Sequence, residues 1–202
     1  MEQTICIFGD SIAWGAVDPE SGGWVGQLRR HFETGDYCDV TVYNQGVCGD
    51  SSKDLLMRFN VECIVREPQI IIFAIGTNDS HYTLSKDNPY VSLEKFQKNL
   101  IALVNQAEKF SDKIIFVGLT KIDESKMMPT PWETEKFYDN DNITRYNSVI
   151  EKVCAELGLP FVDLLNLLET NDLDDGLHPN GNGHKKMFLR IKEFLQTKKI
   201  VQ

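Results

Sequence analysis

The chain has 202 residues, of which 42% are hydrophobic and 25% are charged. This composition can bury a substantial core, and we expect one domain that spans residues 1–202. The net charge of -9 argues against a protein that binds nucleic acid or anionic membranes, because both need a basic face.

The cysteines and the start of the chain bear on the compartment. No two cysteines form a CxxC pair or zinc spacing, and we expect most of the five to be reduced packing residues: Cys6, Cys38, Cys48, Cys63 and Cys154. The chain starts without a cationic stretch and apolar signal core, and no apolar run is long enough to cross a bilayer. These features predict a cytoplasmic protein without membrane insertion.

The first apolar, β-branched run covers residues 4–8 and ends in Gly9-Asp10-Ser11. This pattern predicts a buried strand that delivers one hydroxyl to its carboxyl end. Open α/β sheets carry their chemistry at that end. Taken alone, Ser11 is better explained as the N-cap of the next helix, so its interpretation depends on the rest of the chain.

The remaining elements alternate between helix and strand. After the first strand, we expect strands over residues 40–43, 69–75, 114–119 and 161–163. Between and after them we expect helices over about 24–32, through 55–59, over about 92–110, over about 142–157 and through 187–195. This alternation implies a parallel sheet between two helix layers. Residues 120–141 show no clear periodicity, and long connections of this kind often form lids or pocket walls.

Three residues can supply nucleophilic catalysis. A serine hydroxyl is a weak nucleophile that needs a base within hydrogen-bond reach and a third group to orient the base. Asp175 and His178 are three positions apart in a turn-rich stretch, so the carboxylate can hold one ring nitrogen while the other faces Ser11. Acyl transfer also needs donors for the developing oxyanion; the candidates are the backbone N–H groups of Ser11 and Gly49 and the side-chain amide of Asn78.

Four sequence blocks together resemble the GDSL, or SGNH, hydrolase family. They are Gly9-Asp10-Ser11-Ile12, Asn44-Gln45-Gly46-Val47-Cys48-Gly49, Gly76-Thr77-Asn78-Asp79 and Asp175-Gly176-Leu177-His178-Pro179. Each block is weak alone, but four in this order at successive strand ends are a strong signal that covers most of the chain. One departure is Ile12, where the family name has leucine, a volume-conserving change.

The resemblance implies a flavodoxin-like three-layer α/β/α sandwich whose five-stranded parallel sheet has the order 2-1-3-4-5. It also implies a serine esterase that uses no metal or other cofactor. In this chain Ser11 would be the nucleophile, His178 the base and Asp175 its partner. Gly49 and Asn78 would be the oxyanion donors.

Other polar and aromatic residues have weaker assignments. We expect Asp10 and Asp79 to brace their turns rather than do chemistry, and His184 to lie in the first turn of the last helix, outside the site. Two interpretations of Trp14 are equally supported: a side chain packed in the core, or a wall of the pocket. Trp132 can line an acyl pocket or simply fix its loop.

Two other classes of protein fit parts of the pattern. A flavodoxin-like binder can hold a phosphate or flavin on the glycine-rich strand ends. A metal-dependent hydrolase can recruit Asp10, Asp79, Asp175 and His178 as ligands. For the esterase, the partner is a small-molecule ester, and the candidates include a thioester, an O-acetylated sugar and a lysophospholipid.

Overall fold

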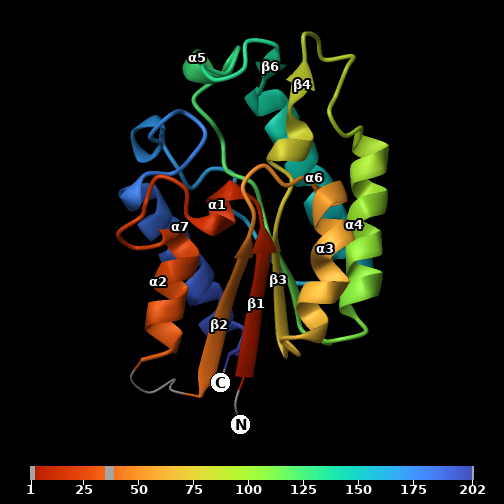
Figure 1. The fold of residues 1–202 in the computed structure, drawn as a ribbon, viewed down its shortest axis with the longest axis vertical. Helices are drawn as coiled ribbons and strands as arrows, with labels where there is room; N and C mark the ends of the chain where they lie inside the picture. Colours follow the sequence, from red (N-terminus) through yellow and green to blue (C-terminus); the bar gives the residue numbers. More distant parts are fainter. Residues whose placement is uncertain (1–2, 35–38, 202) are drawn as a thin grey trace.

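The computed structural model describes residues 3–34 and 39–201 and has a parallel sheet at its centre (Figure 1). The order of the sheet is β2-β1-β3-β5-β7, which is 2-1-3-4-5 when these five strands are counted in chain order, as the resemblance implies. Its strands are β1 (Gln3–Gly9), β2 (Val40–Gly46), β3 (Ile70–Ala74), β5 (Ile114–Val117) and β7 (Phe161–Val162).

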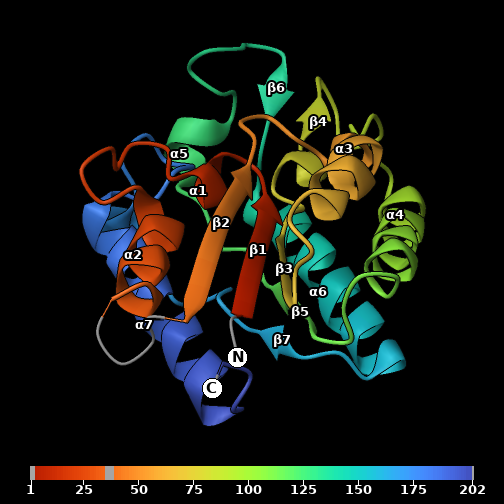
Figure 2. The ribbon, with the colours of Figure 1, turned by 60° about the horizontal axis from the view of Figure 1, so that its bottom comes forward.

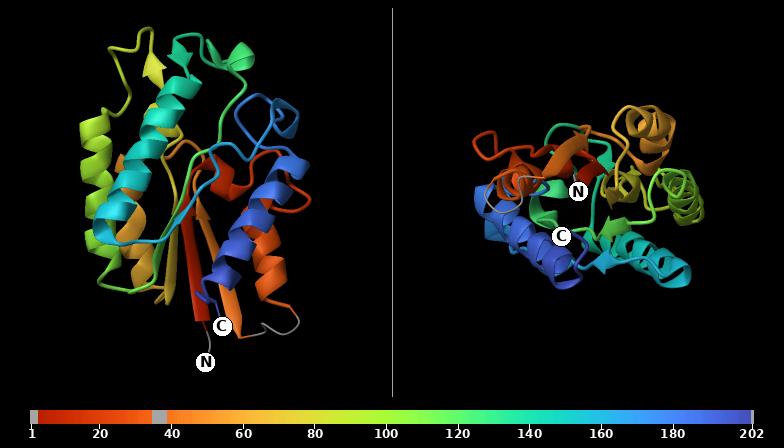
Figure 3. Two further views of the ribbon diagram at one scale, coloured as in Figure 1. Left: turned by 180° about the vertical axis from the view of Figure 1, so that it is seen from behind. Right: turned by 90° about the horizontal axis from the view of Figure 1, so that it is seen from below.

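Helices cover both faces of this sheet and make the three expected layers. One face carries α2 (Gly23–Phe32) and α7 (Gly181–Thr197). The other carries α3 (Ser52–Ile64), α4 (Leu93–Ala107) and α6 (Asn140–Leu157). The two groups lie on opposite sides when the molecule is tilted (Figure 2) and when it is seen from behind (Figure 3).

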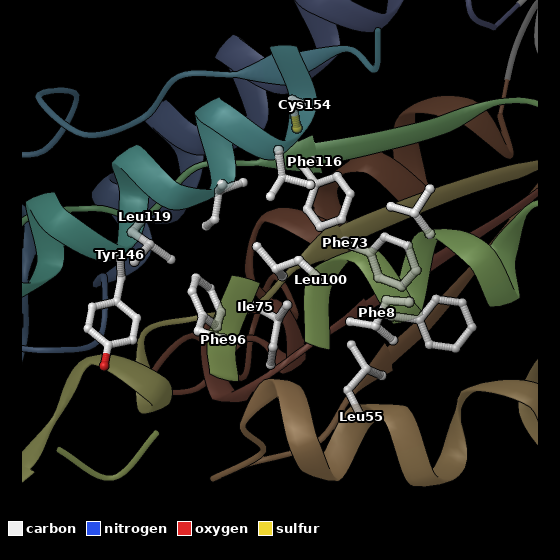
Figure 4. Close-up of a cluster of buried hydrophobic side chains, with 14 of the residues drawn as sticks. Phe8, Leu55, Phe73, Ile75, Phe96, Leu100, Phe116, Leu119, Tyr146 and Cys154 are labelled. Atoms are coloured by element: carbon white, nitrogen blue, oxygen red, sulfur yellow. The ribbon is translucent and has the colours of Figure 1, made fainter. Parts of the chain in front are cut away.

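Successive side chains of the buried strands point to opposite faces of the sheet and pack into two separate hydrophobic cores. In β1, Ile5 and Ile7 pack toward α2 and α7, whereas Cys6 and Phe8 pack toward α3, α4 and α6. The second core is rich in aromatic rings; the Phe73 ring centroid lies 6.0 Å from that of Phe8 and 5.0 Å from that of Phe116 (Figure 4). Burial on both faces explains the near-continuous apolar run of β3.

Three of the cysteines are packing residues, as expected. Cys6, Cys63 and Cys154 are buried free thiols, and burial raises the pKa of each to about 12. Cys48 differs because it is exposed. Cys38 lies outside the described residues.

A small second sheet was not predicted from the sequence. Strand β4 (Tyr82–Thr83) pairs antiparallel with β6 (Lys136–Phe137), beyond the carboxyl ends of the main strands (Figure 1). Two residues per strand are too few for a period-2 pattern to be visible. The pair anchors the segment 120–141, which also contains α5 (Glu124–Met127).

Boundaries differ from the expected ones by a few residues. Strand β2 continues to Gly46 because its last residues still pair with β1, up to Gly9. Helix α6 begins at Asn140, since the side chain of Asp139 caps it by accepting a hydrogen bond from the N–H of Asn142 at 2.8 Å. No helix within the described parts of the chain is both long and apolar enough to span a bilayer.

Candidate active site

Ser11 lies just after the carboxyl end of β1 and is the first residue of the one-turn helix α1 (Ser11–Trp14). The N-cap is Asp10, not Ser11: its Oδ1 accepts from the N–H of Ile12 at 2.9 Å, which leaves the hydroxyl of Ser11 free for another partner. Gly9 permits this tight turn, because a Cβ there would lie 2.4 Å from the carbonyl oxygen of Ala74. Any side chain at this position would push β1 and β3 apart.

The expected partners of Ser11 meet it in the fold. Oγ of Ser11 lies 2.9 Å from Nε2 of His178, although 167 positions separate the two residues. On the other side of the ring, Nδ1 of His178 lies 2.6 Å from Oδ2 of Asp175. The hydrogen-bonding pattern places a proton on Nδ1 and leaves Nε2 to accept from the serine hydroxyl.

Asp175 is held as a carboxylate by its own turn. Its Oδ1 accepts from the backbone N–H groups of Leu177 at 2.9 Å and His178 at 2.8 Å. Burial acts to raise the pKa of Asp175, but the hydrogen bonds from the His178 ring and from these two N–H groups outweigh it and lower the pKa to about 2. The carboxylate is therefore charged throughout the neutral range and can stabilise an imidazolium.

Gly49 lies in the loop after β2, which is tied to the Ser11 turn at several points. Nδ2 of Asn44 donates to the carbonyl oxygen of Ala13 at 2.9 Å. Arg58 donates from Nε to Oδ2 of Asp50 at 2.6 Å and from Nη2 to the carbonyl oxygen of Gly9 at 3.1 Å. Gly49 itself has φ of +85°, and no atom lies within 4 Å of the place where a Cβ would stand.

Asn78 begins the 3-10 turn η2 (Asn78–Ser80) after β3. Its Nδ2 donates to the carbonyl oxygen of Asp50 at 3.0 Å, which links it to the loop that holds Gly49. An amide nitrogen carries two hydrogens, so one remains for a ligand.

Two residues that the sequence did not single out hold Asn78 in place. The hydroxyl of Tyr138 donates to Oδ1 of Asn78 at 2.9 Å, and Nδ1 of His81 donates to the carbonyl oxygen of Asn78 at 2.6 Å. Burial lowers the pKa of His81 to about 4, so its ring is neutral. Neither residue belongs to a sequence block; only their buried polar groups, seen in the fold, reveal this role.

An open cleft of about 250 Å³ lies over Ser11. We call it the Ser11 cleft. It is lined by Ser11, Ala16, Cys48, Gly49, Asn78, Trp132, Lys136, Tyr138, Leu177 and His178. Trp132 is half exposed, and its ring centroid lies 6.3 Å from that of His178.

The structure does not place Trp14 in the lining of this cleft. Trp14 ends α1, where Ser11, Ile12 and Ala13 are buried, and its own side chain remains 55% exposed. A helix of one turn can bury only one side, and Gly15, in the left-handed conformation, ends it there. Trp14 is therefore neither a core residue nor a wall of the Ser11 cleft.

The other acidic and imidazole groups are occupied elsewhere. Asp79 accepts from the N–H of Ser52 at 2.9 Å and from its hydroxyl at 2.5 Å. His184 is fully buried in the first turn of α7 and bonds the N–H of Trp24 and the carbonyl oxygen of Ala16. Asp10 and Asp79 thus bond backbone and side-chain groups of their own, apart from the Asp175–His178 pair, and residues 3–34 and 39–201 contain no cluster of three or more such groups suited to a metal ion.

Comparison with known proteins gives one family. Residues 7–186 match the family model of the GDSL-like lipase/acylhydrolase family. The chain is 24% identical to an acetylxylan esterase of Geobacillus stearothermophilus, over 93% of both chains. Among solved structures it is similar to a lipase/acylhydrolase from Enterococcus faecalis, with a TM-score of 0.76, 25% identity and coverage of 97% of this chain and 96% of that one. The crystal structure of the Geobacillus stearothermophilus esterase has a TM-score of 0.75 at 20% identity, over 96% of this chain and 94% of that one.

Proposed function

The chain belongs to the GDSL-like lipase/acylhydrolase family and is a hydrolase that acts on ester bonds, and we propose that it cleaves carboxylic esters through an acyl-enzyme on Ser11. The observation that carries this proposal is the unbroken hydrogen-bonded chain from Ser11 Oγ through His178 to Asp175, with distances of 2.9 and 2.6 Å. These distances lie within the reach required of a nucleophile and its base.

In the proposed reaction Oγ of Ser11 attacks the ester carbonyl while Nε2 of His178 takes the hydroxyl proton. Asp175 stabilises the imidazolium that forms. The carbonyl oxygen becomes an oxyanion that accepts from the N–H groups of Ser11 and Gly49 and from Nδ2 of Asn78. The intermediate then expels the alcohol, which receives the proton from His178. Water, activated by the same histidine, hydrolyses the acyl-enzyme and releases the acid.

A relative supports these roles. Crystal structures of the Geobacillus stearothermophilus acetylxylan esterase include catalytic mutants of a serine, an aspartate and a histidine, and its aspartate and histidine are three positions apart. Asp175 and His178 have the same spacing in this chain. This parallel favours the assignment of Ser11, Asp175 and His178 as one catalytic unit.

The size of the cleft favours a short acyl group. Pockets for drug-sized ligands have volumes of roughly 300–1,000 Å³, whereas the Ser11 cleft has about 250 Å³. We therefore propose a small ester, with an O-acetylated sugar as the first candidate, because the relative is named for acetylxylan and Trp132 offers a half-exposed ring at the cleft. Lysophospholipids and other long-chain esters are the second candidate.

The test is active-site labelling combined with an acyl-length series. The protein is treated with a fluorophosphonate, the adduct is located by peptide mass spectrometry, and 4-nitrophenyl esters from acetyl to octanoyl are assayed on the same sample. We expect a single adduct on Ser11, loss of turnover in proportion to labelling, and the highest kcat/KM for the acetyl ester. Ser11→Ala should abolish both signals at an unchanged melting temperature.

Cys48 provides the matched control, since it is a second nucleophile in the same cleft. Although Cys48 is exposed, partial loss of water around its thiol, together with the charges of Asp10 and Asp50, raises the pKa of the thiol, which keeps it protonated and weakly nucleophilic. Cys48→Ala should retain labelling and turnover. An adduct on Cys48, or full turnover in Ser11→Ala, would contradict the proposal.

A further inference from the structure

Among the residues that line the Ser11 cleft in the described parts of the chain, Lys136 is the one lysine or arginine. No aspartate or glutamate lines the cleft there. This contrasts with the whole molecule, which has a net charge of -9. The cation thus stands at the place where substrate must bind, in a protein that is otherwise strongly acidic.

The position of Lys136 is fixed by its backbone. It pairs with Thr83 in the β4–β6 sheet, its N–H donates to the carbonyl oxygen of Glu133 at 3.1 Å, and its carbonyl oxygen accepts from the N–H of Thr130 at 2.8 Å. The same turn carries Trp132. A charge on such a pinned segment loses less conformational entropy on binding than one on a free loop.

The ammonium group of Lys136 has no carboxylate partner within the described residues. Five other lysines form ion pairs within 4.0 Å, namely Lys86, Lys98, Lys126, Lys152 and Lys186, but no carboxylate of residues 3–34 and 39–201 lies that close to Lys136. Its Nζ instead lies 5.3 Å from the centre of the Tyr138 ring. Tyr138 and Lys136 both line the Ser11 cleft, so the cation borders the space in which a substrate would lie.

The partly buried surroundings of Lys136 destabilise its charged form when no anion is bound. Burial lowers the pKa of Lys136, and the charge of Glu133 opposes this only in part. A partly desolvated ammonium that lacks an ion pair gains more from an anion than a fully hydrated one does. A negative group on a substrate bound in the cleft would offset the desolvation free energy of the Lys136 ammonium.

We propose that Lys136 binds a carboxylate or phosphate group on the substrate, so that the preferred substrates are anionic esters. This inference rests on the proposed function, because it specifies the substrate of the same cleft. The negative group can belong to the acyl part or to the alcohol part, and the experiment separates the two.

Two pairs of substrates of nearly equal size isolate the charge. On the acyl side, mono-4-nitrophenyl adipate is compared with its ω-amide; on the alcohol side, 4-acetoxybenzoate is compared with 4-acetoxybenzamide. We expect the wild-type protein to prefer the anionic member of at least one pair by about tenfold in kcat/KM, chiefly through KM. The preference should shrink as salt is raised from about 0.02 to 0.5 M.

Variants then assign the preference to Lys136. In Lys136→Met the preference should vanish while kcat/KM for the neutral members stays within about twofold, and Lys136→Arg should retain it because the charge remains. Lys109→Met is the control for net charge; Lys109 is exposed in the turn after α4, at the opposite end of the sheet, and its loss should change nothing.

The outcomes distinguish the inference from its premise. An equal fall for anionic and neutral members in Lys136→Met, or a wild-type protein without preference in either pair, would overturn the anion-binding role while ester hydrolysis stands. Absence of turnover of all four esters and of any fluorophosphonate adduct on Ser11 would instead overturn the proposed function.

Discussion

The hydroxyl of Tyr138 donates a 2.9 Å hydrogen bond to Oδ1 of Asn78, across a separation of 60 positions in the chain. Tyr138 is almost completely buried and comes directly after β6. Because Oδ1 is engaged by the tyrosine, the amide nitrogen of Asn78 is directed to the other side, toward Asp50 and the Ser11 cleft. Tyr138 is thus a positioning residue for one of the proposed oxyanion donors.

Tyr138→Phe should lower kcat by about tenfold to a hundredfold with little change in KM. Removal of a whole oxyanion donor costs about a hundredfold to a thousandfold, and a misdirected donor should cost less. The buried Oδ1 left without its partner should also lower the free energy of unfolding by about 1–3 kcal/mol. Steady-state kinetics and urea unfolding measure the two effects.

Tyr90→Phe is the matched control for this prediction. Tyr90 stacks on His81 with ring centroids 4.4 Å apart, and its side chain is half exposed. This variant should keep kcat within about twofold. A Tyr138→Phe protein that loses stability but keeps its kcat would show that the hydroxyl serves only the fold.

Asp175→Asn should lower kcat by about a thousandfold to ten-thousandfold. An amide nitrogen in place of Oδ2 can donate to Nδ1 of His178, which moves the ring proton to Nε2 and removes the acceptor that Ser11 needs. The measurement is turnover of 4-nitrophenyl acetate. Asp174→Asn, at the exposed neighbouring position, should remain active, and equal losses in both variants would contradict the assignment.

Gly49→Ala and Gly158→Ala should cost similar stability but differ in activity. Gly49 has φ of +85° and Gly158 has φ of +67°, and neither has an atom within 4 Å of an added Cβ. An alanine at either position should lower the free energy of unfolding only because its Cβ is strained in the left-handed conformation, by roughly 1–2 kcal/mol. Gly158 caps the end of α6, away from the cleft.

Activity separates these two variants. If the N–H of Gly49 serves the oxyanion, relaxation of its backbone should lower kcat by at least about tenfold, whereas Gly158→Ala should retain the wild-type kcat. Urea unfolding and turnover of 4-nitrophenyl acetate are measured for both. Equal activity in the two variants, at equal losses of stability, would argue against a role for the Gly49 N–H.

The buried carboxyl of Asp10 should make stability fall as pH rises. Burial raises its pKa from 3.8 to about 7, against the opposing effect of its hydrogen bond with the N–H of Ile12. The folded state therefore holds this proton more tightly than the unfolded state. The contribution is fully present below about pH 4 and is lost as pH rises to about 7, at a slope on the order of 1 kcal/mol per pH unit.

Asp10→Asn should flatten this part of the pH profile. Asparagine is also a good N-cap, so the turn is retained, and the neutral amide carries no cost of ionisation. Urea unfolding of both proteins at intervals between pH 4 and 8 provides the test. Parallel profiles for the two proteins would show that Asp10 does not titrate in this range.

The sequence by itself determined the architecture and predicted the groups that we propose to react. Periodicity located the five strands of the main sheet and the helices between them, because buried parallel strands and amphipathic helices each leave a pattern several residues long. The four blocks predicted Ser11, Asp175 and His178, and the short Asp-x-x-His spacing made the second contact nearly inevitable. These features are local, so the order of residues was enough to predict them.

Only the tertiary structure decided how the cleft is built. The placement of Tyr138, His81 and Lys136 depends on the β4–β6 pair and on contacts such as Tyr138 to Asn78, which have no local pattern. The exposure of Trp14 depends on which side of a one-turn helix meets the sheet. Hydrogen bonds between distant residues depend on the packing of the whole chain, and for that reason the sequence predicted the proposed catalytic groups but not the residues that hold them in place.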